Sequence, residues 1–194
     1  MFNKFLLLLT IAVMTMGCGE ESSSTVRTTT LNIEKIKLFK RSSNQNILEV
    51  INNARMMQRD CHDGKGVIGP SDPLVWNNNL YSAALEHSQD MAQSNTFSHI
   101  GSGTIYDRTG YVISRKSYFD ERIRANGYEN FSSLGENIAG GQSSLDEVME
   151  SWLRSPEHCA NIMNPLFSEI GVSIRIREDS KYGIYWTQSF GDRY

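Results

Sequence analysis

The first half of the chain has apolar residues at the three- and four-residue spacing of a helix surface. One such stripe predicts a helix from about residue 45 to near Arg59, with Ile47, Val50, Ile51 and Ala54 on its buried side. Glycines and prolines then indicate a loop over residues 60–75. The asparagines at 77–79 are N-cap candidates for a second helix ending near Asn95, with a stripe of Leu80, Ala84, His87 and Met91.

The middle of the chain is predicted to hold shorter elements. Residues 97–110 are rich in Gly and Ser and indicate a loop, residues 117–125 a helix, and residues 134–139 a short strand or turn. Residues 144–147 fit a capping box, and the helix that follows has a buried stripe of Leu145, Val148, Met149 and Trp152. Pro156 ends that helix, and with Ser155 as the cap it begins a short one.

The end of the chain alternates in the manner of β-strands. Ile170, Val172, Ile174 and Ile176 lie on one face of a first strand, and Tyr182, Ile184, Trp186 and Phe190 lie on one face of a second. This pattern predicts a terminal hairpin with one face on the core. Helices combined with antiparallel strands, without a regular βαβ order, indicate an α+β sandwich.

The start of the chain has the pattern of an export signal. Lys4 precedes an apolar run over residues 5–13, which is far shorter than the ~20 residues that span a bilayer. Gly17 directly before Cys18 resembles the bacterial lipobox, in which the cysteine is acylated and the lipid binds the membrane. The alternative is an ordinary signal peptide that is cut nearby, with Cys18 discarded. Both alternatives place the mature chain outside the cytoplasm.

These observations divide the chain into three parts: a signal segment over 1–18, a tether over 19–44 and a domain over 45–194. The tether is rich in Ser and Thr, as flexible linkers are, although the apolar residues within 31–39 leave open a folded N-terminal extension. The remaining length suits one domain with its own core.

A formal net charge of −3 without a basic run argues against nucleic acid as a partner. We expect a monomer.

Cysteine usage points to a disulfide. If Cys18 carries the lipid, two cysteines remain, Cys61 and Cys159, in an oxidising compartment where disulfides persist. Two alternatives stay open at this point. One of these thiols is a nucleophile, or the pair binds a metal.

Several short motifs follow one another in a definite order. They are Leu74-Val75-Trp76-Asn77, the run over 83–92, Phe97-Ser98-His99, Gly135-Glu136-Asn137-Ile138-Ala139, the run over 152–158, the run over 160–165, and the run over 185–191. In this order they resemble the bacterial branch of the CAP superfamily, the cysteine-rich secretory, antigen 5 and pathogenesis-related-1 proteins, also called SCP-like domains. The resemblance covers essentially the whole predicted domain.

The resemblance implies a three-layer α-β-α sandwich with a central antiparallel sheet and a large open cleft. In the wider family, two histidines and two glutamates line this cleft and can hold a divalent cation such as zinc. By motif, His99, Glu136 and His158 match three of the four. Ser155 stands where the Trp-x-x-Glu motif of the family has its glutamate. Two imidazoles and one carboxylate are still a three-ligand set for zinc.

Other candidate residues have simpler interpretations. His87 lies on an apolar helix stripe, which favours a hydrogen-bonded core histidine over a cleft residue. Trp186 is most simply a core residue, with a cleft-facing position as the alternative. Glu136 could bond backbone amides within a glycine-flanked turn.

Three hypotheses for function follow. The first is an exported, lipid-anchored protein of the cell envelope whose cleft binds a small or extended ligand, such as a lipid, a peptide or a cell-wall component, with or without a divalent ion. The second is a metal-dependent hydrolase or peptidase that uses His99, Glu136 and His158. The third is an interaction module with an unused cleft. A serine triad is not indicated, because the sequence has no Gly-x-Ser-x-Gly turn.

Overall fold

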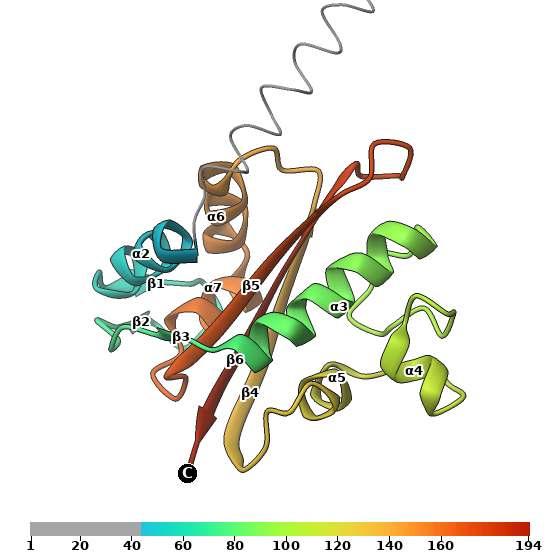
Figure 1. Cartoon of the computed structure of the whole chain (residues 1–194). Helices are drawn as coiled ribbons and strands as arrows, with labels where there is room; N and C mark the ends of the chain where they lie inside the picture. The colour runs from blue at the N-terminus through green and yellow to red at the C-terminus, as the bar shows by residue number, and fades with distance from the viewer. Residues whose placement is uncertain (1–43) are drawn as a thin grey trace, which may run out of the picture. The chain divides into compact units, whose positions relative to one another are not determined.

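The structure, a computed structural model, describes residues 44–194 (Figure 1). The predicted signal segment, Cys18 and nearly all of the predicted tether lie outside the described residues. The centre is a four-stranded sheet with the order β3-β5-β6-β4. Its strands are β3 (Val75–Trp76), β5 (Glu169–Ile176), β6 (Ile184–Arg193) and β4 (Phe131–Gly140). The sheet is antiparallel except for the short β3, which pairs parallel with β5.

Helices cover both faces of this sheet (Figure 1). One face carries α3 (Asn78–Ser94), with α5 (Phe119–Ala125) beside it, and Met91 packs there with Ile138 and Tyr185. The opposite face carries α2 (Asn44–Arg55), α6 (Leu145–Arg154) and α7 (Pro156–Met163), and its core includes Trp152 and Trp186. The result is the α+β sandwich of α-β-α type that the sequence predicts.

The prediction that the terminal hairpin has only one face on the core was wrong. Residues on the other face, among them Ser173, Tyr185 and Thr187, are also buried, because α3 lies against them. Small residues permit this close approach. A Cβ atom added at Gly171 would lie 1.9 Å from the backbone nitrogen of Tyr81 in α3. The alternation of apolar residues in the sequence therefore identifies the more apolar of the two buried faces of the hairpin.

Several element boundaries differ from those predicted. Helix α2 ends at Arg55 rather than near Arg59, and the predicted loop contains a two-stranded sheet of β1 (Arg59–Asp60) and β2 (Val67–Ile68). Strand β4 is longer than predicted. Helix α4 (Arg108–Val112) was missed, because its large apolar residues face outward and give no buried stripe.

Two contacts fix α7 against the start of the domain. Arg55, fully buried at the end of α2, donates hydrogen bonds to the carbonyl oxygens of Ile162 and Asn164, at 2.7 and 3.0 Å. The predicted disulfide between Cys61 and Cys159 is present and confirmed, with 5.5 Å between the two Cα atoms. Helix α7 carries His158, so these contacts also position a candidate site residue.

Strand β4 is the last strand of the sheet, and side chains cover part of its outer edge. The carbonyl oxygen of Ile138 accepts a hydrogen bond from Trp152 Nε1 at 3.1 Å. The carbonyl oxygen of Glu136 accepts one from Asn161 Nδ2 at 3.2 Å. Unpaired strand edges promote pairing with other chains, so this cover protects the domain from edge-to-edge association.

Candidate functional site

His99 and His158 line one pocket beside the outer edge of β4. The pocket has a volume of about 620 Å³ and lies between the loop after α3 and the helices α6 and α7. Its wall is mainly apolar and includes Phe97, Ile100, Ile138, Trp152 and Tyr182. The rings of Phe97 and Tyr182 pack with their centroids 4.8 Å apart. An apolar cavity of this size with a few polar groups is the usual form of a small-ligand site.

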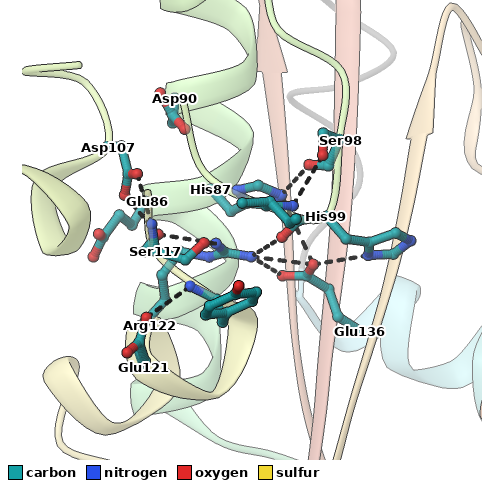
Figure 2. Close-up of polar contacts among 12 residues, drawn as sticks. Glu86, His87, Asp90, Ser98, His99, Asp107, Ser117, Glu121, Arg122 and Glu136 are labelled. Atoms are coloured by element: carbon teal, nitrogen blue, oxygen red, sulfur yellow. Dashed lines mark hydrogen bonds and ion pairs between the residues drawn. The ribbon is translucent and has the colours of Figure 1, made fainter. Parts of the chain in front are cut away.

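His99 is held by the carboxylate of Glu136 (Figure 2). The Nδ1 atom of His99 lies 3.0 Å from Oε1 of Glu136, so Nδ1 carries the proton and donates it to the carboxylate. About half of the His99 side chain is exposed, whereas the Glu136 side chain is almost completely buried. In the neutral ring, Nε2 is then a hydrogen-bond acceptor.

Glu136 is itself paired with a buried cation. Arg122 Nη2 lies 2.9 Å from Oε2 and 3.2 Å from Oε1 of Glu136, and both side chains are nearly inaccessible to solvent. Burial raises the pKa of the Glu136 carboxyl, but the charge that His87 carries at low pH, the charge of Arg122 and the hydrogen bonds from His99 and Arg122 outweigh it. Together they lower the pKa to about 2. Glu136 is therefore ionised at neutral pH.

Arg122 connects the carboxylate to the loop that carries His99. Its Nη2 atom also donates to the carbonyl oxygen of His99 at 2.9 Å, and its Nη1 atom donates to the carbonyl oxygen and the hydroxyl of Ser117 (Figure 2). Arg122 was not predicted as a site residue. The sequence feature that could indicate this role is that Arg122 directly precedes Ile123 on the buried side of a short helix, and this feature is weak.

His87 is the hydrogen-bonded core histidine that its helix stripe predicts. It is fully buried, and its Nε2 atom lies 2.9 Å from the carbonyl oxygen of Ser98, to which it donates. The same atom lies 3.7 Å from Glu136 Oε1. Burial is the main cause that lowers the pKa of His87 to about 4, so the ring is neutral at pH 7. Arg122 is consequently the permanent cation beside Glu136.

His158 lies in the first turn of α7, as predicted, and is half-buried. Burial, followed by the nearby His99, lowers the pKa of its imidazole. Its backbone is tied to β4, because Asn137 Nδ2 donates to the carbonyl oxygen of His158 at 3.1 Å. The pocket thus has one imidazole from the loop after α3 and one from α7.

The two remaining candidates have structural positions. Ser155 is the N-cap residue of α7, and its side chain makes no capping hydrogen bond. Trp186 is fully buried and donates from Nε1 to the carbonyl oxygen of Gln142 at 2.9 Å. Its ring packs edge-on against Trp152, which lines the pocket.

The three side chains predicted as metal ligands do not meet as a three-ligand set. His99 and His158 share the pocket, but both oxygens of Glu136 face Arg122 behind His99. Within residues 44–194, no group of three or more His, Cys, Asp or Glu side chains is arranged to hold a metal ion. The arrangement does not fit a site in which Glu136 is a direct ligand, and we derive no chemical step through a metal. The predicted binding of a divalent cation in this pocket stays a prediction.

The described residues form an α-β-α sandwich with the Cys61–Cys159 disulfide and with His99 and His158 in one pocket. The model of the family described as "CAP: Cysteine-rich secretory protein family" matches residues 48–190, and the chain belongs to this family. Part of the chain is 35% identical, over 118 residues, to the protein YkwD of Bacillus subtilis (strain 168), covering 61% of this chain and 39% of YkwD. The membrane protein YlbC of the same strain is 27% identical over 163 residues, covering 83% of this chain and 38% of YlbC.

Solved structures show the same fold. An extracellular protein containing a SCP domain from Bacillus anthracis str. Ames matches with a TM-score of 0.56 and 25% identity, over 77% of this chain and 40% of that one. An outer surface protein from Borrelia burgdorferi matches with a TM-score of 0.53 and 20% identity, over 83% of this chain and 94% of that one. This chain spans less than half the length of both Bacillus subtilis relatives.

Within residues 44–194, no helix is long and apolar enough to cross a membrane.

Proposed function

We propose that this protein works outside the cytoplasm as a ligand-binding CAP domain tethered to a membrane through Cys18. The observation that supports binding is the pocket of about 620 Å³ whose wall combines apolar side chains with two imidazoles. Apolar walls with few polar groups suit a ligand that is largely apolar and carries one or two hydrogen-bonding groups. Lipids and peptides with apolar side chains have this character.

The polar groups of the pocket suit neutral hydrogen-bonding groups of a ligand. In the neutral His99 ring, whose Nδ1 proton is donated to Glu136, the Nε2 atom accepts a hydrogen bond from a ligand hydroxyl or amide. Among residues 44–194, no acidic side chain lines the pocket, since Glu136 is turned toward Arg122. No observation favours hydrolysis over binding, so catalysis forms no part of the proposal.

Filling the pocket should abolish binding without disturbing the fold. Ser151 is an exposed residue of α6 that lines the pocket, so Ser151→Trp places a large ring inside it. Removing an imidazole with His158→Ala should weaken binding about tenfold, the equivalent of one lost hydrogen bond of roughly 1.4 kcal/mol. Titration of the purified protein with a fluorescent fatty-acid analogue, a sterol analogue and an apolar peptide library measures both effects.

The matched control is His62→Asn, which alters an exposed histidine in the loop beside Cys61. This variant should bind as the wild type does. If Ser151→Trp and His158→Ala bind every probe as tightly as the wild type, the pocket is not the binding site.

Anchoring is tested separately from binding. Replacing Cys18 with serine removes the thioether-forming sulfur, so the protein should move from the membrane fraction to the soluble fraction of the cell. Intact mass analysis of the wild-type protein should show the added acyl mass, and Cys18→Ser should lack it. Retention of Cys18→Ser in the membrane at wild-type levels would contradict lipid anchoring through this residue.

A further inference from the structure

Three large apolar side chains are exposed in succession where α4 ends. Tyr111, Val112 and Ile113 have 61%, 77% and 41% of their surface exposed. With Ser114, they form the segment that we call the α4 tip. Single exposed apolar residues are common on protein surfaces, but several consecutive ones on one protruding segment indicate an interaction surface. In Figure 1, α4 lies at the margin of the domain, away from the sheet.

The base of the α4 tip is tightly constrained. The backbone nitrogen of Arg115 donates to the carbonyl oxygen of Gly110 at 3.0 Å, which closes the segment into a short loop. Below it, the buried carboxylate of Asp107 accepts hydrogen bonds from the backbone nitrogens of Gly110 and Ser117, at 2.9 and 3.0 Å. A Cβ atom at Gly110 would lie 2.1 Å from Asp107 Oδ2. The apolar side chains are therefore presented from a fixed base.

Three basic residues lie in or beside the tip, and two of them form ion pairs with acidic residues of other elements. From Arg108 to Tyr118 the sequence contains Arg108, Arg115 and Lys116 and no Asp or Glu. Arg115 pairs with Glu121 of α5, and its guanidinium lies 5.7 Å from the centre of the Tyr118 ring. Lys116 is exposed. Arg108 pairs with Glu86 at 3.3 Å, so Lys116 is the basic side chain of this segment that lies outside the two ion pairs.

We propose that the α4 tip inserts into the surface of a membrane that contains anionic lipids. Apolar side chains of this size enter the boundary between headgroups and acyl chains, and tyrosine is enriched at that depth. A basic side chain beside them, here Lys116, contacts lipid phosphates. A stable protein partner would need roughly 800 Å² from each side, which far exceeds three side chains. The inference goes beyond the proposed ligand binding and does not depend on it.

The test measures the depth of the tip in the full chain on vesicles of phosphatidylglycerol and phosphatidylcholine. An environment-sensitive dye is attached at Val112→Cys. Its emission should shift to shorter wavelength on these vesicles, and lipids with spin labels near the headgroup should quench it. Lys116→Ala should raise the lipid concentration needed for the shift about fivefold, because one basic residue near the surface contributes about 1 kcal/mol.

The matched control is the same dye at Val67→Cys in β2. Val67 is apolar and 66% exposed, like Val112, but lies outside α4. A dye at this position should stay in water on all vesicles. The proposal is overturned if the dye at position 112 also stays in water, if both dyes shift equally, or if the tip becomes buried only when envelope proteins are added. A lipid on Cys18 would hold both labelled proteins on the vesicle equally. The difference between the dye at position 112 and the dye at position 67 is therefore independent of anchoring.

Discussion

Arg122→Met should lower the free energy of unfolding by about 3–5 kcal/mol, because it leaves a buried carboxylate without its cation. Arg122 pairs with Glu136 at 2.9 Å, and both side chains are nearly inaccessible to water. Arg122 also donates to the carbonyl oxygen of His99, so the variant loses the support of the pocket loop as well. Urea unfolding of the purified domain at pH 7 measures the change.

The matched control for this variant is Arg124→Ala in the same helix. Arg124 is exposed and forms an i,i+4 ion pair with Asp120 at 3.8 Å. Exposed helix pairs of this kind are worth about 0.3–0.5 kcal/mol, and the guanidinium also lies 4.3 Å from the centre of the Phe131 ring, an exposed contact worth about 0.5–1 kcal/mol. Arg124→Ala should therefore cost much less than Arg122→Met. Equal effects of the two substitutions would show that the pair between Arg122 and Glu136 does not stabilise the fold.

The effect of Arg122→Met should also depend on pH in a defined direction. The pKa of Glu136 is lowered from 4.5 to about 2, so its contribution to stability is complete above pH 4.5 and is lost as the pH falls toward 2. Without Arg122, the carboxyl of Glu136 takes up a proton more readily. Once it is protonated, the cost of burying its negative charge disappears. The difference in unfolding free energy between wild type and variant should therefore shrink on acidification. A loss of packing alone would not depend on pH in this way.

Removing the disulfide should cost a similar amount. Cys61 and Cys159 are buried and 98 residues apart, and a cross-link over a loop of this length stabilises by about 4–5 kcal/mol on the chain-entropy model. The double variant Cys61→Ala, Cys159→Ala should show this loss in urea unfolding under oxidising conditions. The cause is the greater freedom of the unfolded chain, which no longer has the connection between α7 and the loop after α2.

Reduction provides the control for the disulfide. Wild-type protein in dithiothreitol should unfold at the same urea concentration as the double variant, whereas the double variant should not respond to dithiothreitol. A double variant that keeps wild-type stability would show that packing around α7 is sufficient without the cross-link.

Elements with a clear amphipathic period were the ones that the sequence predicted well. Helix α6 has the predicted stripe from Leu145 to Trp152 on the core, and Asn77 and Asn95 are the N-cap and C-cap of α3. Helix α4 could not be found by the same method, because its apolar residues face solvent. The hairpin was misjudged on one face because small residues such as Gly171 carry no apolar signal, although they allow α3 to pack there.

The candidate site was predictable in its residues but not in its connections. Motif order singled out His99, Glu136 and His158, and the structure brings the two histidines to one pocket and Glu136 behind His99. The pairing of Glu136 with Arg122 could not be inferred, because the two are 14 residues apart on different elements and nothing in the local pattern links them. An ion pair of this kind depends on tertiary packing, and the periodicity of apolar residues in the sequence does not predict which charged residues meet.

The covered edge of β4 has a consequence for how ligand preference can evolve. Trp152 and Asn161 occupy the outward carbonyl oxygens of Ile138 and Glu136, so a bound molecule meets mainly side chains rather than main-chain groups. Several of those side chains come from the loop after α3 and from the turn before β6, outside the strands of the sheet. Substitutions in these connections change the wall of the pocket without changing the hydrogen bonds between the strands.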